Sequence, residues 1–349
     1  MKKNFLVALA FLSGILFSSC EVEFSPNDDW KEVPVVYCVL DQDDDTSYVR
    51  VQRCFMGEGN QYSFATNADS INYPQGSISV IMEEWAKYTD DAGHTYRSGN
   101  APKRSFSFSY QLMPKDDGDF YSANQPVFAC PTAGILDSTC IYRIRVVKNA
   151  TADTIATAET TLISGDMLLT NPNSVTLFQF SGTSGSKKCD IRWSAMEDAR
   201  QYQPVVRFFY RDFIVDQTVV PYDTIIRPHY IDIPCNSVKS NMRNPFYSTQ
   251  LDQNYFLSTV KANIHDTCNK NVIDTVQIFI TCCNEPLAAY LYSNNPAGSL
   301  NQDPFLYTNV EGGLGVVASR RRHISFRIES PGSSVSNYKK SLHDLGVGF

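Results

Sequence analysis

The sequence lacks the short motifs that mark common catalytic and metal sites. It contains no H-E-x-x-H, no G-x-S-x-G and no C-x-x-C, although ten cysteines are present. Zinc proteases, α/β-hydrolases and zinc ribbons therefore lack their usual signatures. The glycines of 312–315 are not followed by the lysine of a phosphate loop. The histidines lie far apart in the chain, at His94, His229, His265, His323 and His343. We expect no catalytic residue, no metal and no cofactor.

Positive charge is also scarce. The chain has 30 Lys and Arg against 37 Asp and Glu, a formal net charge of −7. Removing Lys2 and Lys3 with an N-terminal signal takes this charge from −7 to −9. A chain this acidic is poorly suited to bind nucleic acid, or an anionic lipid surface by charge.

The first twenty residues read as an export signal. Lys2 and Lys3 precede an apolar run over 5–17, which is shorter than the roughly 20 residues that span a bilayer. Small residues and then Cys20 follow, an order that resembles a bacterial lipoprotein signal. The resemblance implies a signal peptide at 1–19, a lipid on Cys20 and a lipidated tether over 20–32. An ordinary secretory signal cut near Cys20 is the alternative.

The next part of the chain predicts strands. β-branched runs at 33–40 and 46–54 flank an acidic turn at 41–45, the pattern of a hairpin. Asp41, Asp43 and Asp45 resemble the start of a calcium loop. Because Thr46 and Gln52 stand where such a loop needs Gly and Glu, we favour a solvated turn. Further alternating runs, separated by polar turns, predict an N-terminal β-sandwich over residues 33–165; they lie at 76–88, 104–112, 140–148 and 154–163.

A boundary is expected near 164–172, and a second domain over 166–330. A strand that ends in Trp193, followed by a Tyr-bearing strand at 202–210, resembles a fibronectin type III domain. The resemblance implies that Trp193 fills the space between two sheets, with Tyr202 on a neighbouring strand. The expected fold is all-β, with two tandem immunoglobulin/fibronectin-like β-sandwich domains after a lipoprotein signal peptide.

The C-terminal part of the chain carries other expectations. Short helices are expected at 244–251 and 288–291, and a strand at 273–282. Three glycines close together at 312–315 indicate a backbone that bends or approaches a neighbour closely. We expect this Gly-rich segment to pack through apolar side chains, with the arginines of 320–322 at its rim. Residues 331–349 read as a weakly ordered tail.

Nine cysteines remain after Cys20. Export permits disulfides, and an odd number leaves at least one thiol unpaired or partnered elsewhere. Short loops between expected strands predict a disulfide between Cys130 and Cys140, and one between Cys268 and either Cys282 or Cys283.

The C-terminal segment also carries a family resemblance. Residues 303–319 contain Tyr307-Thr308-Asn309 followed by the Gly-rich hydrophobic stretch. Together with 193–210 and Cys20, this segment resembles a family of Bacteroidota outer-membrane lipoproteins known only as a domain of unknown function. The resemblance covers most of residues 20–330 and transfers no catalytic residue. It implies a lipid-anchored outer-membrane protein, which we expect to face the cell exterior.

Several Asp-Ser/Thr-aliphatic tripeptides resemble the O-glycosylation site of secreted Bacteroidota proteins. Their candidate acceptors are Ser70, Thr154, Thr224 and Thr275. The alternative is that Asp-Thr before an aliphatic residue begins strands after turns.

Two functions from different classes fit these features. The first is a non-enzymatic accessory subunit docked on an outer-membrane β-barrel of a transporter, secretion or assembly machine. Its docking candidates are Arg320, Arg321 and Arg322, which suit a carboxylate or phosphate, the alternative being a solvated strand edge. The second is a surface glycan- or peptide-binding lipoprotein, with a platform of Trp30 or Trp85 and Tyr62, Tyr73 and Tyr96. A hydrolase with a carboxylate pair is a third and weaker hypothesis.

Overall fold

The computed structural model describes most of the chain beyond the predicted export signal. The described residues are 32–54, 66–91, 95–115, 124–173, 178–183, 185–216, 218, 223–264, 270–294, 307–325 and 337–346. The predicted signal peptide, Cys20, the tether up to residue 31 and Cys268 lie outside them. The described part is mostly β, as the alternating patterns predict. No helix within it is long and apolar enough to cross a membrane.

The strands of the described residues form three sheets. The largest has nine strands, and neighbours follow the order β14 (Asp223–Pro234), β13 (Gln201–Asp216), β17 (Lys270–Cys283), β18 (Leu314–Ile324), β1 (Pro34–Leu40), β2 (Thr46–Arg53), β7 (Gln125–Pro131) and β6 (Ser109–Met113), with β15 (Val238–Lys239) beside β13. The second sheet joins β10 (Leu169–Asn171), β12 (Ser186–Ser194), β11 (Ser181–Thr183) and β16 (Phe246–Asp252). The third joins β4 (Thr95–Ser98), β3 (Ile78–Thr89), β8 (Cys140–Lys148), β9 (Thr154–Thr161) and β5 (Arg104–Ser107).

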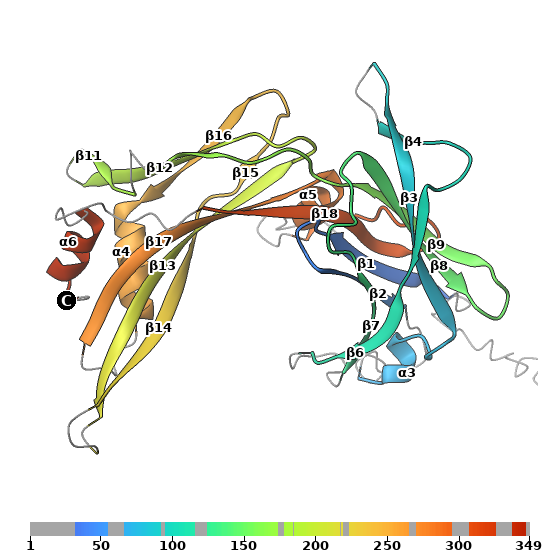
Figure 1. Cartoon of the computed structure of the whole chain (residues 1–349), viewed down its shortest axis with the longest axis horizontal. Coiled ribbons are helices and arrows are strands. Elements are labelled where there is room, and N and C mark those ends of the chain that lie inside the picture. Colours follow the sequence, from blue (N-terminus) through green and yellow to red (C-terminus); the bar gives the residue numbers. More distant parts are fainter. Residues whose placement is uncertain are drawn as a thin grey trace, which may run out of the picture.

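Two hydrophobic cores lie between these sheets. The first lobe is the part of the chain built around the core that includes Val36, Val49, Met82, Ile144 and Val317. These residues come from the nine-stranded sheet and from the third sheet. The second lobe is the core that includes Trp193, Tyr202, Phe208, Phe256 and Ile278. Figure 1 shows the two lobes side by side, with β18 running between them.

Strand β18 belongs to both lobes. Its first half, 314–319, lies parallel to β1, with Leu314 opposite Val35 and Ser319 opposite Leu40. Its second half, 320–324, lies antiparallel to β17, with Arg320 opposite Cys283. One strand therefore continues the backbone ladder of the first lobe into the second, and the large sheet is uninterrupted between them. The Gly-rich segment expected within the second domain thus pairs with β1, the first strand of the described residues.

The glycines before and within β18 permit this close pairing. A Cβ on Gly313 would meet Pro34 O, and a Cβ on Gly315 would meet Val36 O, both at clashing distance. A Cβ on Gly312 would lie 2.6 Å from Ile155 O. Gly312 and Gly315 also have positive φ, at 76° and 109°. The predicted close approach is confirmed, and its partners are β1 and β9.

Helices contribute little to the first lobe and more to the second. They are α3 (Ala68–Ile71), α4 (Gln253–Asn263), α5 (Glu285–Ser293) and α6 (Asn337–Asp344). The expected helix at 288–291 is confirmed as part of α5. The expected helix at 244–251 is wrong, because most of that segment is β16, which pairs with β12.

The predicted weakly ordered tail is wrong over 337–346. Residues 337–344 form α6, whose Leu342 is buried in the second core. Lys339 Nζ donates to Asp274 O at 2.7 Å, and Gln253 Nε2 donates to Ser341 Oγ at 3.1 Å. Burial of Leu342 and these two hydrogen bonds hold α6 against the second lobe. The polar composition of the tail does not predict this helix, because the helix is stabilised by tertiary contacts.

Candidate functional site

The arginines of β18 lie where the two lobes meet. Arg320 Nε lies 3.3 Å from Asp41 Oδ2, and Arg320 Nη2 lies 3.3 Å from Asp44 Oδ2. Arg321 Nε lies 3.1 Å from Asp43 Oδ2. The acidic turn is exposed at residues 43–45, as expected of a solvated turn, and it also supplies the counter-charge of these arginines.

Asp41 anchors one end of this turn in the protein interior. Its side chain is buried, and burial raises the pKa of its carboxyl above the ordinary value, against the opposing effects of the Asp43 N–H and Arg320. Of the three docking candidates, Arg320 and Arg321 form ion pairs within the chain, whereas Arg322 is exposed.

A buried polar cluster fixes the same junction from the other side. Asn284 Nδ2 donates to Thr160 Oγ1 at 2.7 Å and to Thr161 O at 3.1 Å. The Asn284 Oδ1 accepts from the N–H of Ser319, whose Oγ donates to Thr161 O. The cluster joins β9, β18 and the start of α5. Because these buried polar groups are hydrogen-bonded to one another, their burial does not leave an unsatisfied donor or acceptor.

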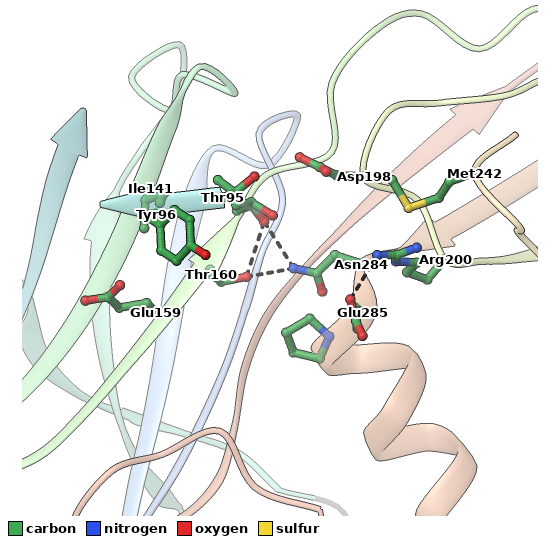
Figure 2. Close-up of a pocket in the computed structure, with 12 residues that line it drawn as sticks. Thr95, Tyr96, Ile141, Glu159, Thr160, Asp198, Arg200, Met242, Asn284 and Glu285 are labelled. Atoms are coloured by element: carbon green, nitrogen blue, oxygen red, sulfur yellow. Dashed lines mark hydrogen bonds and ion pairs between the residues drawn. The ribbon is translucent and has the colours of Figure 1, made fainter. Parts of the chain in front are cut away.

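Beside this cluster lies a cavity of about 450 Å³. We call it the junction groove. It is lined by Thr95, Tyr96, Ile141, Glu159, Thr160, Thr161, Asp198, Arg200, Met242, Asn284, Glu285 and Pro286. Figure 2 shows Tyr96, Thr160 and Glu159 on one side, with Asp198, Arg200 and Met242 on the other. The groove therefore takes its lining from both lobes.

Every carboxylate of the junction groove has a basic partner. Glu159 Oε1 lies 2.7 Å from Arg97 Nε. Asp198 Oδ2 lies 3.1 Å from Lys87 Nζ, and Glu285 Oε2 lies 3.0 Å from Arg200 Nη2. Glu159 Oε1 also lies 3.7 Å from Arg143 Nε, so each carboxylate has at least one basic partner and none offers an unpaired charge to a cation.

Two backbone positions in the groove are unusual. Asp198 and Met242 have φ of 64° and 57°, and the third non-glycine residue with positive φ in the described part of the chain is Ala152. Such conformations cost roughly 1–3 kcal/mol and gather at binding sites more often than elsewhere. Asp tolerates this region, whereas the long side chain of Met242 has no local reason to adopt it.

Few residues of the groove could be predicted from the sequence. Tyr96 is a platform candidate of the second hypothesis, but Asp198, Arg200 and Asn284 are residues that sequence reasoning missed. A signal existed for one of them: Asn284 directly precedes Glu285-Pro286, the pattern of a helix N-terminus. The side chain of Asn284 makes no cap hydrogen bond and binds β9 and β18 instead.

The predicted disulfide between Cys130 and Cys140 is not present, and Cys268, the predicted partner of Cys282 or Cys283, lies outside the described residues. Cys130 lies on β7 opposite Ser47, whereas Cys140 begins β8 opposite Ala86, so the two belong to different sheets. Both have free thiols, as do Cys282 and Cys283. Burial raises the pKa of Cys38, Cys189, Cys235 and Cys282 to about 12. These thiols stay protonated near neutral pH and are poor nucleophiles.

The other sequence candidates are dispersed. Thr275 is fully buried in β17, so the folded chain does not expose this glycosylation candidate. Ser70 in α3, Thr154 in β9 and Thr224 in β14 remain predictions. Trp85 and Tyr73 are buried and Tyr96 is exposed; Trp30 and Tyr62 lie outside the described residues. The described residues contain no group of three or more His, Cys, Asp or Glu able to hold a metal.

Comparisons with known proteins identify no family for this chain. No family model matches, and no curated protein matches. Among solved structures, the chain is similar to the C-terminal globular domain of an oligosaccharyltransferase from Pyrococcus abyssi, with 8% identity and a TM-score of 0.22. The match covers 71% of this chain and 47% of that chain, so this chain spans about half the length of that structure. A likeness this low carries no argument about fold or function.

Proposed function

We propose that this chain is a non-enzymatic, lipid-anchored accessory protein of a Bacteroidota outer membrane. In this proposal its two tandem immunoglobulin/fibronectin-like domains face the cell exterior and dock on a membrane β-barrel protein. The N-terminal sequence supports the anchor, since Cys20 directly follows an apolar run and two small residues. The observation that carries the docking is the long open edge of the nine-stranded sheet.

The two edges of that sheet differ in length. At one end β6 has 5 residues, and at the other β14 has 12. Short edge strands protect a sheet from pairing with other chains, whereas long ones invite it. Strand β14 is therefore the better surface for a protein partner that adds a strand.

The side chains of β14 support this choice. Ile225, Ile226 and Tyr230 are exposed on a strand that pairs with β13 along its other edge. Pro228 interrupts the edge, because proline has no N–H to offer a partner. The stretch 224–227 lies beyond that interruption, and Figure 1 shows this end of the β13–β14 hairpin extending away from both cores.

Of the three arginines proposed to contact a partner, one remains a docking candidate. Arg320 and Arg321 are engaged with Asp41, Asp43 and Asp44, so their charge is already matched within the chain. Arg322 is exposed and is retained as the docking candidate of this group. The platform of the competing surface-binding hypothesis is weakened, because Trp85 and Tyr73 are buried.

Ile226→Lys tests the docking edge. Ile226 is 51% exposed, so the protein is expected to fold, while the new charge opposes strand addition. Recovery of a barrel protein from mildly solubilised outer membranes is expected to fall at least about fivefold, or about 1 kcal/mol. Leu112→Lys on β6 is the matched control, with 57% exposure, and should leave recovery unchanged. Equal recovery with both variants would show that β14 is not the docking edge.

Cys20→Ala tests the anchor separately. Without the thiol no acyl chain can be attached, and the mature chain is expected to leave the membrane fraction. The measurement is partition of the mutant and the wild type between detergent and aqueous phases, with mass spectrometry of the N-terminal peptide. A mutant that still partitions with the detergent as the wild type does would remove the lipid assignment.

A further inference from the structure

The junction groove has the features of a ligand site that is separate from the β14 edge. It joins a cavity of about 450 Å³, within the roughly 300–1,000 Å³ of small-molecule sites, to side chains held by their neighbours. Asn284 is fixed by Thr160 and Ser319, and Glu285 by Arg200. The polar groups are therefore positioned before any ligand arrives, which lowers the entropy cost of binding.

The charges of the groove indicate an uncharged ligand. Asp198 and Glu285 each face one basic group and Glu159 faces two, Arg97 and Arg143, so a cationic ligand would meet no unpaired carboxylate. An ionised carboxylate has about four acceptor sites and a guanidinium five donors, and one ion pair uses only part of them. A ligand hydroxyl both donates and accepts. It can therefore donate to an unused acceptor site of the carboxylate and accept from an unused N–H of the guanidinium in the same ion pair.

Tyr96 adds a flat apolar surface beside these polar groups. Tyr96 is 51% exposed as a residue and lines the groove on the first-lobe side in Figure 2. The negative face of an aromatic ring attracts the polarised C–H groups of a ligand that lies flat on it. On the opposite side, Met242 offers a polarisable, adaptable side chain from a backbone position with positive φ.

We propose that the junction groove binds a short neutral carbohydrate. Its sugar ring lies on Tyr96, and its hydroxyls contact the ion pairs of Asp198 and Glu285 and the lining threonines. Carbohydrate is the class that combines an uncharged, hydroxyl-rich rim with apolar C–H faces. Thr95 and Tyr96 lie on β4, an end strand of the third sheet, so a peptide that adds a strand there is the competing occupant that the test must distinguish. The inference does not depend on docking at β14.

The test is titration of the mature, detergent-solubilised chain with maltose, cellobiose and N,N′-diacetylchitobiose, in a detergent without a sugar headgroup. At least one sugar is expected to bind with a Kd of about 1 mM or tighter. Tyr96→Ala and Asp198→Asn are expected to weaken that binding at least about tenfold, or about 1.4 kcal/mol. Asn keeps the size of Asp and tolerates positive φ, so the loop conformation is retained.

Tyr88→Ala is the matched control. Tyr88 lies opposite Tyr96 on the same hairpin and is 57% exposed, but it does not line the groove. Its variant is expected to bind the sugar within about twofold of the wild type. The proposal is overturned if no sugar binds saturably, or if Tyr88→Ala loses as much affinity as Tyr96→Ala. It is also overturned if glucuronic acid, glucosamine or a tetra-alanine peptide binds more tightly than the neutral sugars.

Discussion

Gly315→Ala is expected to lower the free energy of unfolding by more than about 3 kcal/mol, the range that signals a backbone clash in a core. Gly315 lies in the parallel ladder opposite Val36, and an added Cβ would collide with Val36 O. Backbone cannot move aside as a flexible side chain can, so β1 and β18 must separate. Since β18 joins both lobes, the damage is expected to reach both cores.

Gly76→Ala separates the clash from the cost of an unusual backbone conformation. Gly76 also has positive φ, at 79°, but an added Cβ there would meet nothing within 4 Å. Its variant should therefore lose only the roughly 1–2 kcal/mol of a left-handed alanine. The measurement is the midpoint of chemical denaturation for both variants and the wild type. Equal losses would show that β18 does not approach β1 as closely as described.

The Gly-rich segment illustrates what the sequence can and cannot predict. Glycine spacing indicates that the backbone approaches something closely, and that much is confirmed at Gly312, Gly313 and Gly315. The partner is beyond local reasoning, because β1 and β18 come from opposite ends of the chain. A parallel pair between them depends on the closure of the whole sheet, which no short window of residues encodes.

The acidic turn shows the same dependence on distant residues, although Asp43, Asp44 and Asp45 are exposed as expected of a solvated turn. Its hairpin geometry follows from the flanking alternation, and β1 and β2 are antiparallel as predicted. Its role follows from β18, which brings Arg320 and Arg321 against Asp41, Asp43 and Asp44. The groove shares this dependence, because its residues come from strands of one lobe and loops of the other.

The spacing of Cys130 and Cys140 predicts a disulfide that the fold does not allow. A short loop between two strands favours a disulfide only if both strands lie beside each other. The chain from Cys130 to Cys140 instead leaves the nine-stranded sheet and enters the facing one. Both thiols then pack as small apolar groups in the first core, a common role for free cysteine.

Trp193→Ala is expected to cost about 3–5 kcal/mol, the usual penalty for emptying a large aromatic site. The predicted burial of Trp193 is confirmed, since its side chain is fully enclosed in the second core. Its ring centroid lies 5.5 Å from that of Tyr202. Tyr202 sits on β13 of the nine-stranded sheet, so it faces Trp193 across the core and is not on a neighbouring strand of the same sheet.

Trp193→Phe distinguishes the loss of side-chain volume from the effect of removing an unpaired indole N–H. The indole N–H of Trp193 is buried and has no hydrogen-bond partner in the described structure. Phe removes that unsatisfied donor and keeps much of the ring, so its variant should lose clearly less stability than Trp193→Ala. The measurement is the free energy of unfolding for both variants. If Trp193→Ala melts within about two degrees of the wild type, the substitution lowers the free energy of unfolding by less than about 1 kcal/mol. Trp193 would then not be the centre of this core.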